Sequence, residues 1–127
     1  MNRIYISGPM TGIPDFNHPA FHAEAARLRA LGYDVINPAE INTDPTAPWH
    51  ECLKKDLMAL LQCDTVAVLP GGEWSRGVRL ELQVAGQLQI DIVLAADIQH
   101  PPRSEIRHHN PIIRPYIFRE LGNKEKS

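Results

Sequence analysis

Short apolar runs alternate with longer segments of helical periodicity along this chain of 127 residues. The apolar runs are residues 3–7, 33–37, 65–69 and 90–94, and the helical segments are residues 19–31, 49–62 and 75–89. Strands that alternate with helices in this way are typical of βαβ units, in which the strands are parallel. The pattern predicts an α/β protein with a mainly parallel sheet of four or five strands.

Composition limits what the chain can bind. The length fits one domain, residues 1–98, followed by an extension, residues 99–127, that we expect to pack on this domain or on a partner subunit. A net charge of −2 gives no basic surface for nucleic acid, and no apolar run approaches the roughly 20 residues of a membrane span. Two isolated cysteines, Cys52 and Cys63, and no recognisable signal peptide favour a reduced, cytoplasmic location. We expect a small-molecule ligand.

No segment has the spacing of a metal or cofactor site. The only histidine cluster, His108 and His109, lies in a polar tail, where such a pair is usually solvated. The run of residues 8–12 is not GxGxxG and lacks the Lys of a P-loop, so neither dinucleotide nor P-loop binding is supported. A Gly-Pro or Pro-Gly-Gly sequence is more often a turn, although backbone amides after a strand also bind anions or hydroxyls. We predict no cofactor and no metal.

Three polar loops are expected to meet at one edge of the sheet. Ligands of open parallel sheets bind outside the carboxyl ends of the strands, where the strand order reverses. For the order 2-1-3-4, that edge is bounded by residues 8–12, 37–38 and 70–75. The predicted substrate contacts in the first two loops and at the start of the third are Gly8, Pro9, Met10, Thr11, Gly12, Asn37 and Gly71.

Glu81 interrupts the apolar face of the third helical segment. At about 100° per residue it falls within an arc formed by Val78, Leu82, Val84, Ala85 and Leu88. An ionised carboxylate without partners is costly to bury, so this position indicates either compensation or a functional role. The alternative is a salt-bridged Glu, or one placed near the start of its helix.

Asp56 occupies a similar position in the second helical segment. It lies with Leu53, Leu57 and Leu60 at the spacing of one helix face. Alone, it could equally be an edge acid that reaches solvent or pairs with Lys. Two such misplaced acids in one small domain favour a functional site. Ser75 is either the N-cap of the third helix, a ligand contact, or both, and Tyr5 is most simply a core residue whose hydroxyl needs a partner.

These residues carry a family resemblance. The sequences Ile4-Tyr5-Ile-Ser-Gly8, Asp56 to Asp64 and Ser75-x-Gly77-x-x-x-Glu81 are similar to those of the nucleoside 2-deoxyribosyltransferase superfamily. The opening Tyr-Ile-Ser-Gly-Pro-Met-Thr-Gly is most similar to uncharacterised phage and prophage members, and deoxynucleoside 5′-monophosphate N-glycosidases are relatives. The resemblance covers roughly residues 3–95.

The resemblance implies a flavodoxin-like (Rossmann-like) three-layer fold and attack at the anomeric carbon of a nucleoside. Glu81 matches the nucleophile, Asp56 the acid that handles the departing base, and Tyr5 the residue that orients the nucleophile. Ser75 and Gly77 match the loop that holds the 5′ end of the sugar. Pro9 and Thr11 replace a Ser and an Arg that help the monophosphate hydrolases to hold phosphate. The resemblance also implies a homodimer or larger homo-oligomer, with a neighbouring subunit completing each site.

The chemistry of the residues agrees with this activity. A carboxylate can trap an oxocarbenium-like sugar covalently, while a second, protonated acid protonates the leaving base. We therefore expect an N-glycosidase or deoxyribosyltransferase that acts on a (deoxy)nucleoside or its 5′-monophosphate through a glycosyl-Glu81 intermediate. The alternative is a non-catalytic module that binds or senses a nucleotide on the same fold.

Overall fold

Four parallel strands form a sheet in the computed structural model, which describes residues 1–72 and 75–103. The strands are β1 (Arg3–Ser7), β2 (Asp34–Ile36), β3 (Thr65–Val68) and β4 (Asp91–Leu94). Their order across the sheet is β2-β1-β3-β4, which is the order that the predicted binding edge requires. The predicted α/β, flavodoxin-like fold is confirmed.

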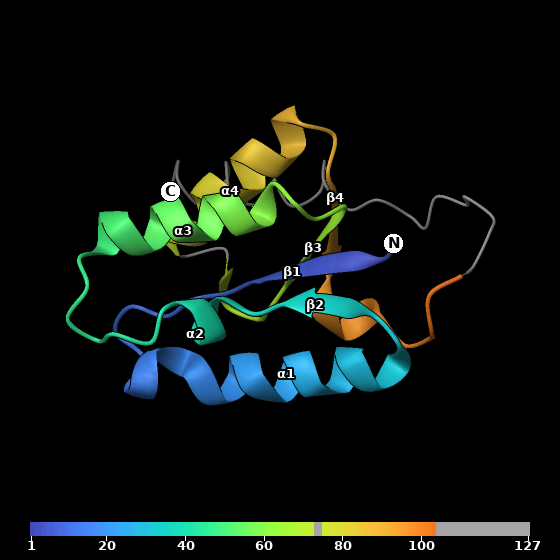
Figure 1. Ribbon diagram of the computed structural model, residues 1–127, viewed down its shortest axis with the longest axis horizontal. Coiled ribbons are helices and arrows are strands. Elements are labelled where there is room, and N and C mark those ends of the chain that lie inside the picture. The colour runs from blue at the N-terminus through green and yellow to red at the C-terminus, as the bar shows by residue number, and fades with distance from the viewer. Residues whose placement is uncertain (73–74, 104–127) are drawn as a thin grey trace.

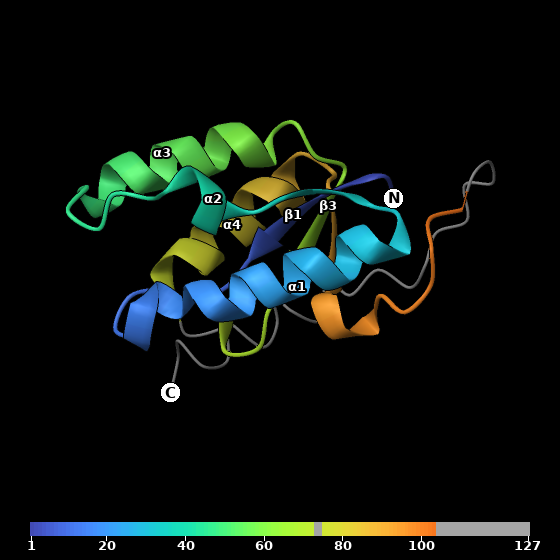
Figure 2. The ribbon, with the colours of Figure 1, turned by 60° about the horizontal axis from the view of Figure 1, so that its bottom comes forward.

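Helices cover both faces of the sheet. α1 (His18–Leu31) packs on one face, and α3 (Trp49–Leu60) and α4 (Arg76–Gln87) pack on the other (Figure 1). The short α2 (Pro38–Ile41) lies between α1 and α3 and contacts both, as Figure 2 shows. Two 3-10 turns complete the described elements: η1 (Pro14–Asn17) before α1 and η3 (Ala95–Asp97) after β4.

The side chains of β1 alternate between the two layers of the core. Ile4 and Ile6 pack with the buried residues of α1, whereas Tyr5 packs with those of α3 and α4. Residues two apart on a strand point to the same face, so Ser7 follows Tyr5. Both are almost completely buried. The strand therefore delivers two hydroxyl groups to the side of the sheet that α4 covers.

The strand and helix bounds agree with the sequence pattern to within two residues, but α2 was not predicted. Pro38, which follows the second predicted strand, is the first residue of α2. The Asn37 Oδ1 atom accepts a hydrogen bond from the Ala39 N–H at 3.0 Å and caps the helix. Proline is favoured at this position because the first N–H of a helix has no partner within it.

Two of the predicted apolar faces are less buried than their patterns indicate. Leu88 is 52% exposed because it lies just past the last residue of α4. In α3 only Leu60 is fully buried, and Trp49 remains partly exposed. The N-terminal part of the α3 face is turned towards a cavity instead of the core.

The last described residues pack against the turn between α1 and β2. The Tyr33 hydroxyl donates to the backbone carbonyl of His100 at 2.8 Å. The Arg27 guanidinium donates to the carbonyls of Ala95 and Ile98, which ties η3 to α1. Residues 104–127, including His108, His109 and most of the predicted extension, lie outside the described residues, as do residues 73–74. Among the described helices, none is long and apolar enough to cross a membrane.

Gly8 follows β1 at a point that leaves no room for a side chain. A Cβ atom there would lie 2.9 Å from the Leu69 Cβ and 3.1 Å from the Phe21 Cζ. We expect Gly8→Ala to lower the free energy of unfolding by about 1–3 kcal/mol, measured by chemical denaturation. Gly77→Ala is the matched control, because a Cβ there has its nearest neighbours at 3.9 and 4.0 Å. Alanine also favours the helix, so this variant should lose no stability. Equal losses in the two variants would show that crowding at Gly8 is not the cause.

Candidate active site

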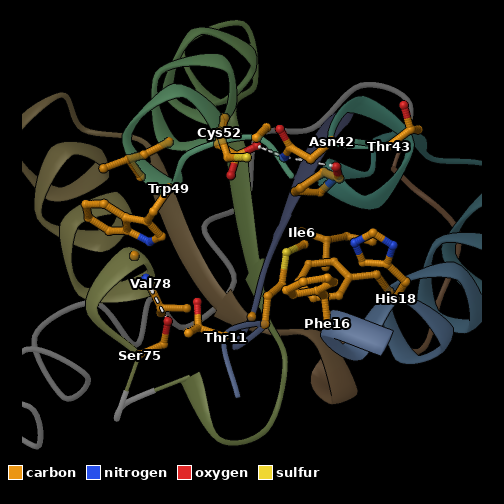
Figure 3. Close-up of a pocket in the computed structure, with 18 of the residues that line it drawn as sticks. Ile6, Thr11, Phe16, His18, Asn42, Thr43, Trp49, Cys52, Ser75 and Val78 are labelled. Atoms are coloured by element: carbon orange, nitrogen blue, oxygen red, sulfur yellow. Dashed lines mark hydrogen bonds between the residues drawn. The ribbon is translucent and has the colours of Figure 1, made fainter. Parts of the chain in front are cut away.

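A cavity of about 560 Å³ opens beyond the carboxyl end of β1. Its walls come from the loop after β1, from α1, from the segment after β2, and from α3 and α4. In Figure 3, Trp49 and Ser75 lie on one side of this cavity, and Phe16 and His18 lie on the other. Its volume is in the range of small-molecule sites.

Glu81 projects from α4 into this cavity, and β1 supplies partners for both of its carboxyl oxygens. The Tyr5 hydroxyl donates to Oε2 at 2.5 Å, and the Ser7 hydroxyl donates to Oε1 at 2.7 Å. Glu81 is only 4% exposed and lies beyond the first turn of α4. Among the described residues, no ion pair involves it. Two hydrogen bonds thus compensate the cost of burying the Glu81 carboxyl, and neither a salt bridge nor the N-terminus of the helix does so.

Burial dominates the ionisation of Glu81. It raises the pKa of the carboxyl to about 8, and the hydrogen bonds from Tyr5 and Ser7 oppose this rise. The charge of Asp56 raises the same pKa further. Burial also raises the pKa of Tyr5 well above its ordinary value, so its hydroxyl stays protonated and remains a donor. The site therefore holds a carboxyl group that is poised to change its charge near neutral pH.

Asp56 faces the same cavity from α3. The Asn42 Nδ2 group donates to Asp56 Oδ1 at 2.7 Å and also to the Pro38 carbonyl at 3.2 Å. Burial raises the pKa of Asp56 to about 6, although the hydrogen bond from Asn42 lowers it. Asn42 Oδ1 is buried without a partner among the described residues, an arrangement that typically costs about 1–3 kcal/mol. The amide is thus oriented entirely through its two N–H groups.

The cavity brings together eight of the residues that the sequence singled out. They are Tyr5, Gly8, Met10, Thr11, Asp56, Ser75, Gly77 and Glu81. Ser75 is confirmed as the N-cap of α4, because its Oγ accepts from the Val78 N–H at 3.3 Å. α4 therefore begins at the cavity, where its first backbone N–H groups lie close to any ligand.

Four other predicted substrate contacts do not line the cavity. Pro9 and Gly71 approach each other, since a Cβ on Gly71 would lie 3.5 Å from the Pro9 ring. Gly12 is exposed in a turn with φ of 84°. Asn37 is 1% exposed and lies behind the wall, where it caps α2.

Several residues of the site were not predicted from the sequence. Ser7 does not line the cavity but donates to Glu81, and it could have been found because it lies two positions after Tyr5 on one strand. Phe16 lies in a stretch of three residues with positive φ, an unusual backbone that no composition pattern indicates. Trp49 is stacked by the Arg76 guanidinium at 3.8 Å, a contact between two helices that their sequences do not reveal. The other unpredicted wall residues include His18, His22, Asn42, Thr43, Asp44 and Cys52.

The charge of the cavity wall is one-sided. Four of the described residues that line it are acidic, namely Asp15, Asp44, Asp56 and Glu81, and none is Lys or Arg. No group of three or more His, Cys, Asp or Glu side chains in the described part of the chain is arranged to hold a metal ion. The described part of the wall therefore offers no cationic side chain to a free anion.

Comparisons with known proteins give a family and a fold. The sequence model of a family described as a domain of unknown function (DUF4406) matches residues 2–94. A search of curated proteins gives no match. A conserved protein from Enterococcus faecalis V583 is 27% identical with a TM-score of 0.57, covering 74% of this chain and 62% of that one.

Two 2-deoxyribosyltransferases share the fold. The enzyme from the psychrotolerant bacterium Bacillus psychrosaccharolyticus is 20% identical with a TM-score of 0.55, covering 84% of this chain and 77% of that one. The enzyme from Leishmania mexicana is 21% identical with a TM-score of 0.57, covering 74% of this chain and 63% of that one. The chain thus spans less than two thirds of the length of the Leishmania and Enterococcus proteins. At these identities the two enzymes show a common fold, in line with the superfamily resemblance of the sequence.

The raised pKa of Glu81 makes the stability of the protein depend on pH. The folded-state value is about 8, and the ordinary value is 4.5. Between these values the unfolded chain releases a proton that the folded protein retains, so stability falls as pH rises and levels off above about 8. We expect the free energy of unfolding to fall by roughly 1–3 kcal/mol between pH 6 and 8. This window begins at the pKa of about 6 for Asp56, so that Glu81 is the main carboxyl that titrates within it. Denaturation curves at several pH values measure it.

Glu81→Gln should flatten the stability curve in this window because the amide does not ionise. Glu51→Gln is the matched control, since Glu51 is exposed on α3 outside the cavity and its variant should keep the wild-type slope. A wild-type curve that is flat between pH 6 and 8, or one that Glu81→Gln leaves unaltered, would contradict the assignment.

Proposed function

Because the chain belongs to the family described as a domain of unknown function (DUF4406), its activity has to be inferred from its site, and we propose that it cleaves or transfers the N-glycosidic bond of a small nucleoside. One observation carries this proposal: a buried carboxyl, Glu81, with both oxygens held by hydroxyl groups, shares a cavity with a second carboxyl of raised pKa, Asp56. The resemblance to nucleoside 2-deoxyribosyltransferases and the fold shared with two of them support the same reaction class.

In the first step, an ionised oxygen of Glu81 attacks the anomeric carbon of the sugar and forms an ester. The bond from this carbon to the base nitrogen breaks, and its electron pair leaves with the base. Protonated Asp56 gives its proton to the base, which departs in neutral form. A hydroxyl donor on each Glu81 oxygen keeps the carboxyl aimed and supports its charge while it is ionised.

In the second step, water or another base attacks the same carbon and releases Glu81 as a carboxylate. Asp56, now ionised, accepts the proton that the incoming group loses. Water gives hydrolysis and a second base gives transfer, so both outcomes use the same two carboxyl groups.

The wall favours a nucleoside with an uncharged 5′ end. Ser75 and Gly77 at the start of α4 supply a hydroxyl and backbone amides for the 5′-hydroxyl group. Among the described residues that line the cavity, no Lys or Arg is placed to pair with a phosphate. A panel of nucleosides and 5′-monophosphates, with free base measured by chromatography with and without an acceptor base, tests the proposal and separates hydrolysis from transfer. Nucleosides that bind without release of base would instead favour the non-catalytic binding module.

Glu81→Gln should abolish base release. The amide fits the same space and still accepts from Tyr5 or Ser7, but it cannot form the ester. We expect kcat/KM to fall by at least about a thousandfold, with the circular dichroism spectrum retained. Glu51→Gln should keep full activity as the control. Loss of helical signal together with activity would show that Glu81 is structural.

The two carboxyl groups should together determine the pH profile. The reactive form needs Glu81 ionised and Asp56 protonated, although their pKa values of about 8 and about 6 favour the opposite arrangement. The reactive form is therefore the less populated of the two singly protonated forms. The profile of kcat/KM should rise near pH 6 and fall near pH 8, as the pair titrates.

Asp56→Asn should remove the fall at alkaline pH, because only the ionisation of Glu81 then remains. It should also slow the release of poor leaving bases by about a hundredfold or more, and that of activated leaving groups far less. An alkaline limb that persists in Asp56→Asn, with equal losses for both kinds of substrate, would exclude Asp56 as the proton donor.

A further inference from the structure

The contacts of Asn37 determine which way its side-chain amide is oriented. The residue is 1% exposed and lies behind the cavity wall. Its Oδ1 accepts the Ala39 N–H at 3.0 Å as the cap of α2. Because a backbone N–H can only donate, the oxygen and nitrogen of this amide cannot be exchanged. Nδ2 therefore occupies the other position and has hydrogen atoms to donate.

That donor faces a histidine of the cavity wall. Asn37 Nδ2 lies 3.2 Å from Nδ1 of His22, a residue of α1 that lines the cavity. Since Nδ2 donates, Nδ1 must accept and carries no proton. The neutral ring then carries its proton on Nε2, and this nitrogen is a hydrogen-bond donor. The His18 ring packs nearly edge-on against the His22 ring, at 80° and 6.1 Å between centroids.

The same short segment holds both His22 and Asp56. Asn37 at the start of α2 contacts His22, and Asn42 just after α2 donates to Asp56. α2 itself packs against both α1 and α3. In Figure 3, Asn42 and His18 lie on the side of the cavity opposite Ser75. His22 therefore belongs to the half of the cavity that contains the proton donor for the base.

We propose that His22 donates its Nε2–H to an acceptor on the leaving base, with Asn37 as the residue that positions it. The site then selects bases that present a carbonyl oxygen or an unprotonated ring nitrogen at this point. The inference rests on the proposed function for the placement of the base near Asp56. The aromatic rings of Phe16 and His18 offer a surface on which a base can stack in any orientation within its plane. The hydrogen bond from His22 would select which edge of the base faces this side of the cavity.

The first test reads the His22 ring in the protein without ligand. Long-range proton–nitrogen correlation spectra, at a pH where the ring is neutral, should show a protonated Nε2 and a bare Nδ1. Asn37→Asp should reverse this, because the carboxylate keeps the helix cap but accepts where the amide donated. His50, exposed on α3 outside the cavity, should keep its signals in the variant. A wild-type His22 protonated on Nδ1, or one unaffected by Asn37→Asp, overturns the inference.

Asn37→Ser serves if the Asp variant does not fold. Serine also caps helices but offers no amide donor to His22. The Nδ1 signal of His22 should then move towards that of the solvated His50. No movement would show that Asn37 does not position the ring.

The second test measures recognition of the base. Glu81→Gln protein is titrated by calorimetry with pairs of nucleosides that differ by one acceptor, such as a purine and its 7-deaza analogue, or a pyrimidine with and without its 4-oxo group. At least one acceptor-bearing member should bind about tenfold more tightly than its partner, the effect of one hydrogen bond. Adding His22→Phe should abolish this ratio, and adding His50→Phe should preserve it.

The outcomes separate the two proposals. A ratio that survives His22→Phe, equal binding within every pair, or no binding of any nucleoside overturns the role of His22. Discrimination that depends on His22, combined with wild-type protein that releases no base, rejects the proposed reaction and keeps the recognition site.

Discussion

The burial of one carboxyl group organises the site of this protein. Glu81 lies on the apolar side of α4 and is tolerated there because two hydroxyl groups of β1 donate to it. That arrangement requires Tyr5 and Ser7 on the same face of an inner strand, and it requires α4 to pack against that face. It also places the start of α4, with Ser75 and Gly77, at the mouth of the same cavity. The contacts between β1 and α4 that hold Glu81 therefore belong both to the packing of the fold and to the site.

The two carboxyl groups of the cavity differ in what surrounds them. Glu81 is the more deeply buried and has two hydroxyl donors, whereas Asp56 has one amide donor from Asn42. Different surroundings are how proteins assign different roles to two chemically similar acids. In the proposed reaction the sugar gains positive charge as the base departs, and this charge favours the ionised form of Glu81. The developing charge on the sugar thus opposes the effect of burial on the pKa of Glu81.

The strands and the long helices could be predicted from the sequence, because apolar runs mark the strands and a period of 3.6 residues marks the helices. Glu81 and Asp56 stood out as exceptions to such repeats. α2 has four residues and is too short to show a period. Periodicity also does not distinguish a face that lines a cavity from one that packs in the core, which is why Leu53 resembled a core residue. Asn42 and His22 are brought to the wall by tertiary contacts, and nothing in their local sequence indicates this.

The double use of Asn37 affects how this site can change during evolution. One amide group caps a helix with its oxygen and holds His22 with its nitrogen, and the helix that it caps leads directly to Asn42 and Asp56. A substitution of Asn37 that releases His22 therefore also removes the cap of α2. It can thereby displace Asn42, the residue that donates to Asp56. In the proposed function, preference for the base would change more freely through the exposed residues of the loop between α2 and α3, such as Thr43 and Asp44. Those side chains line the cavity and carry no structural duty for α2.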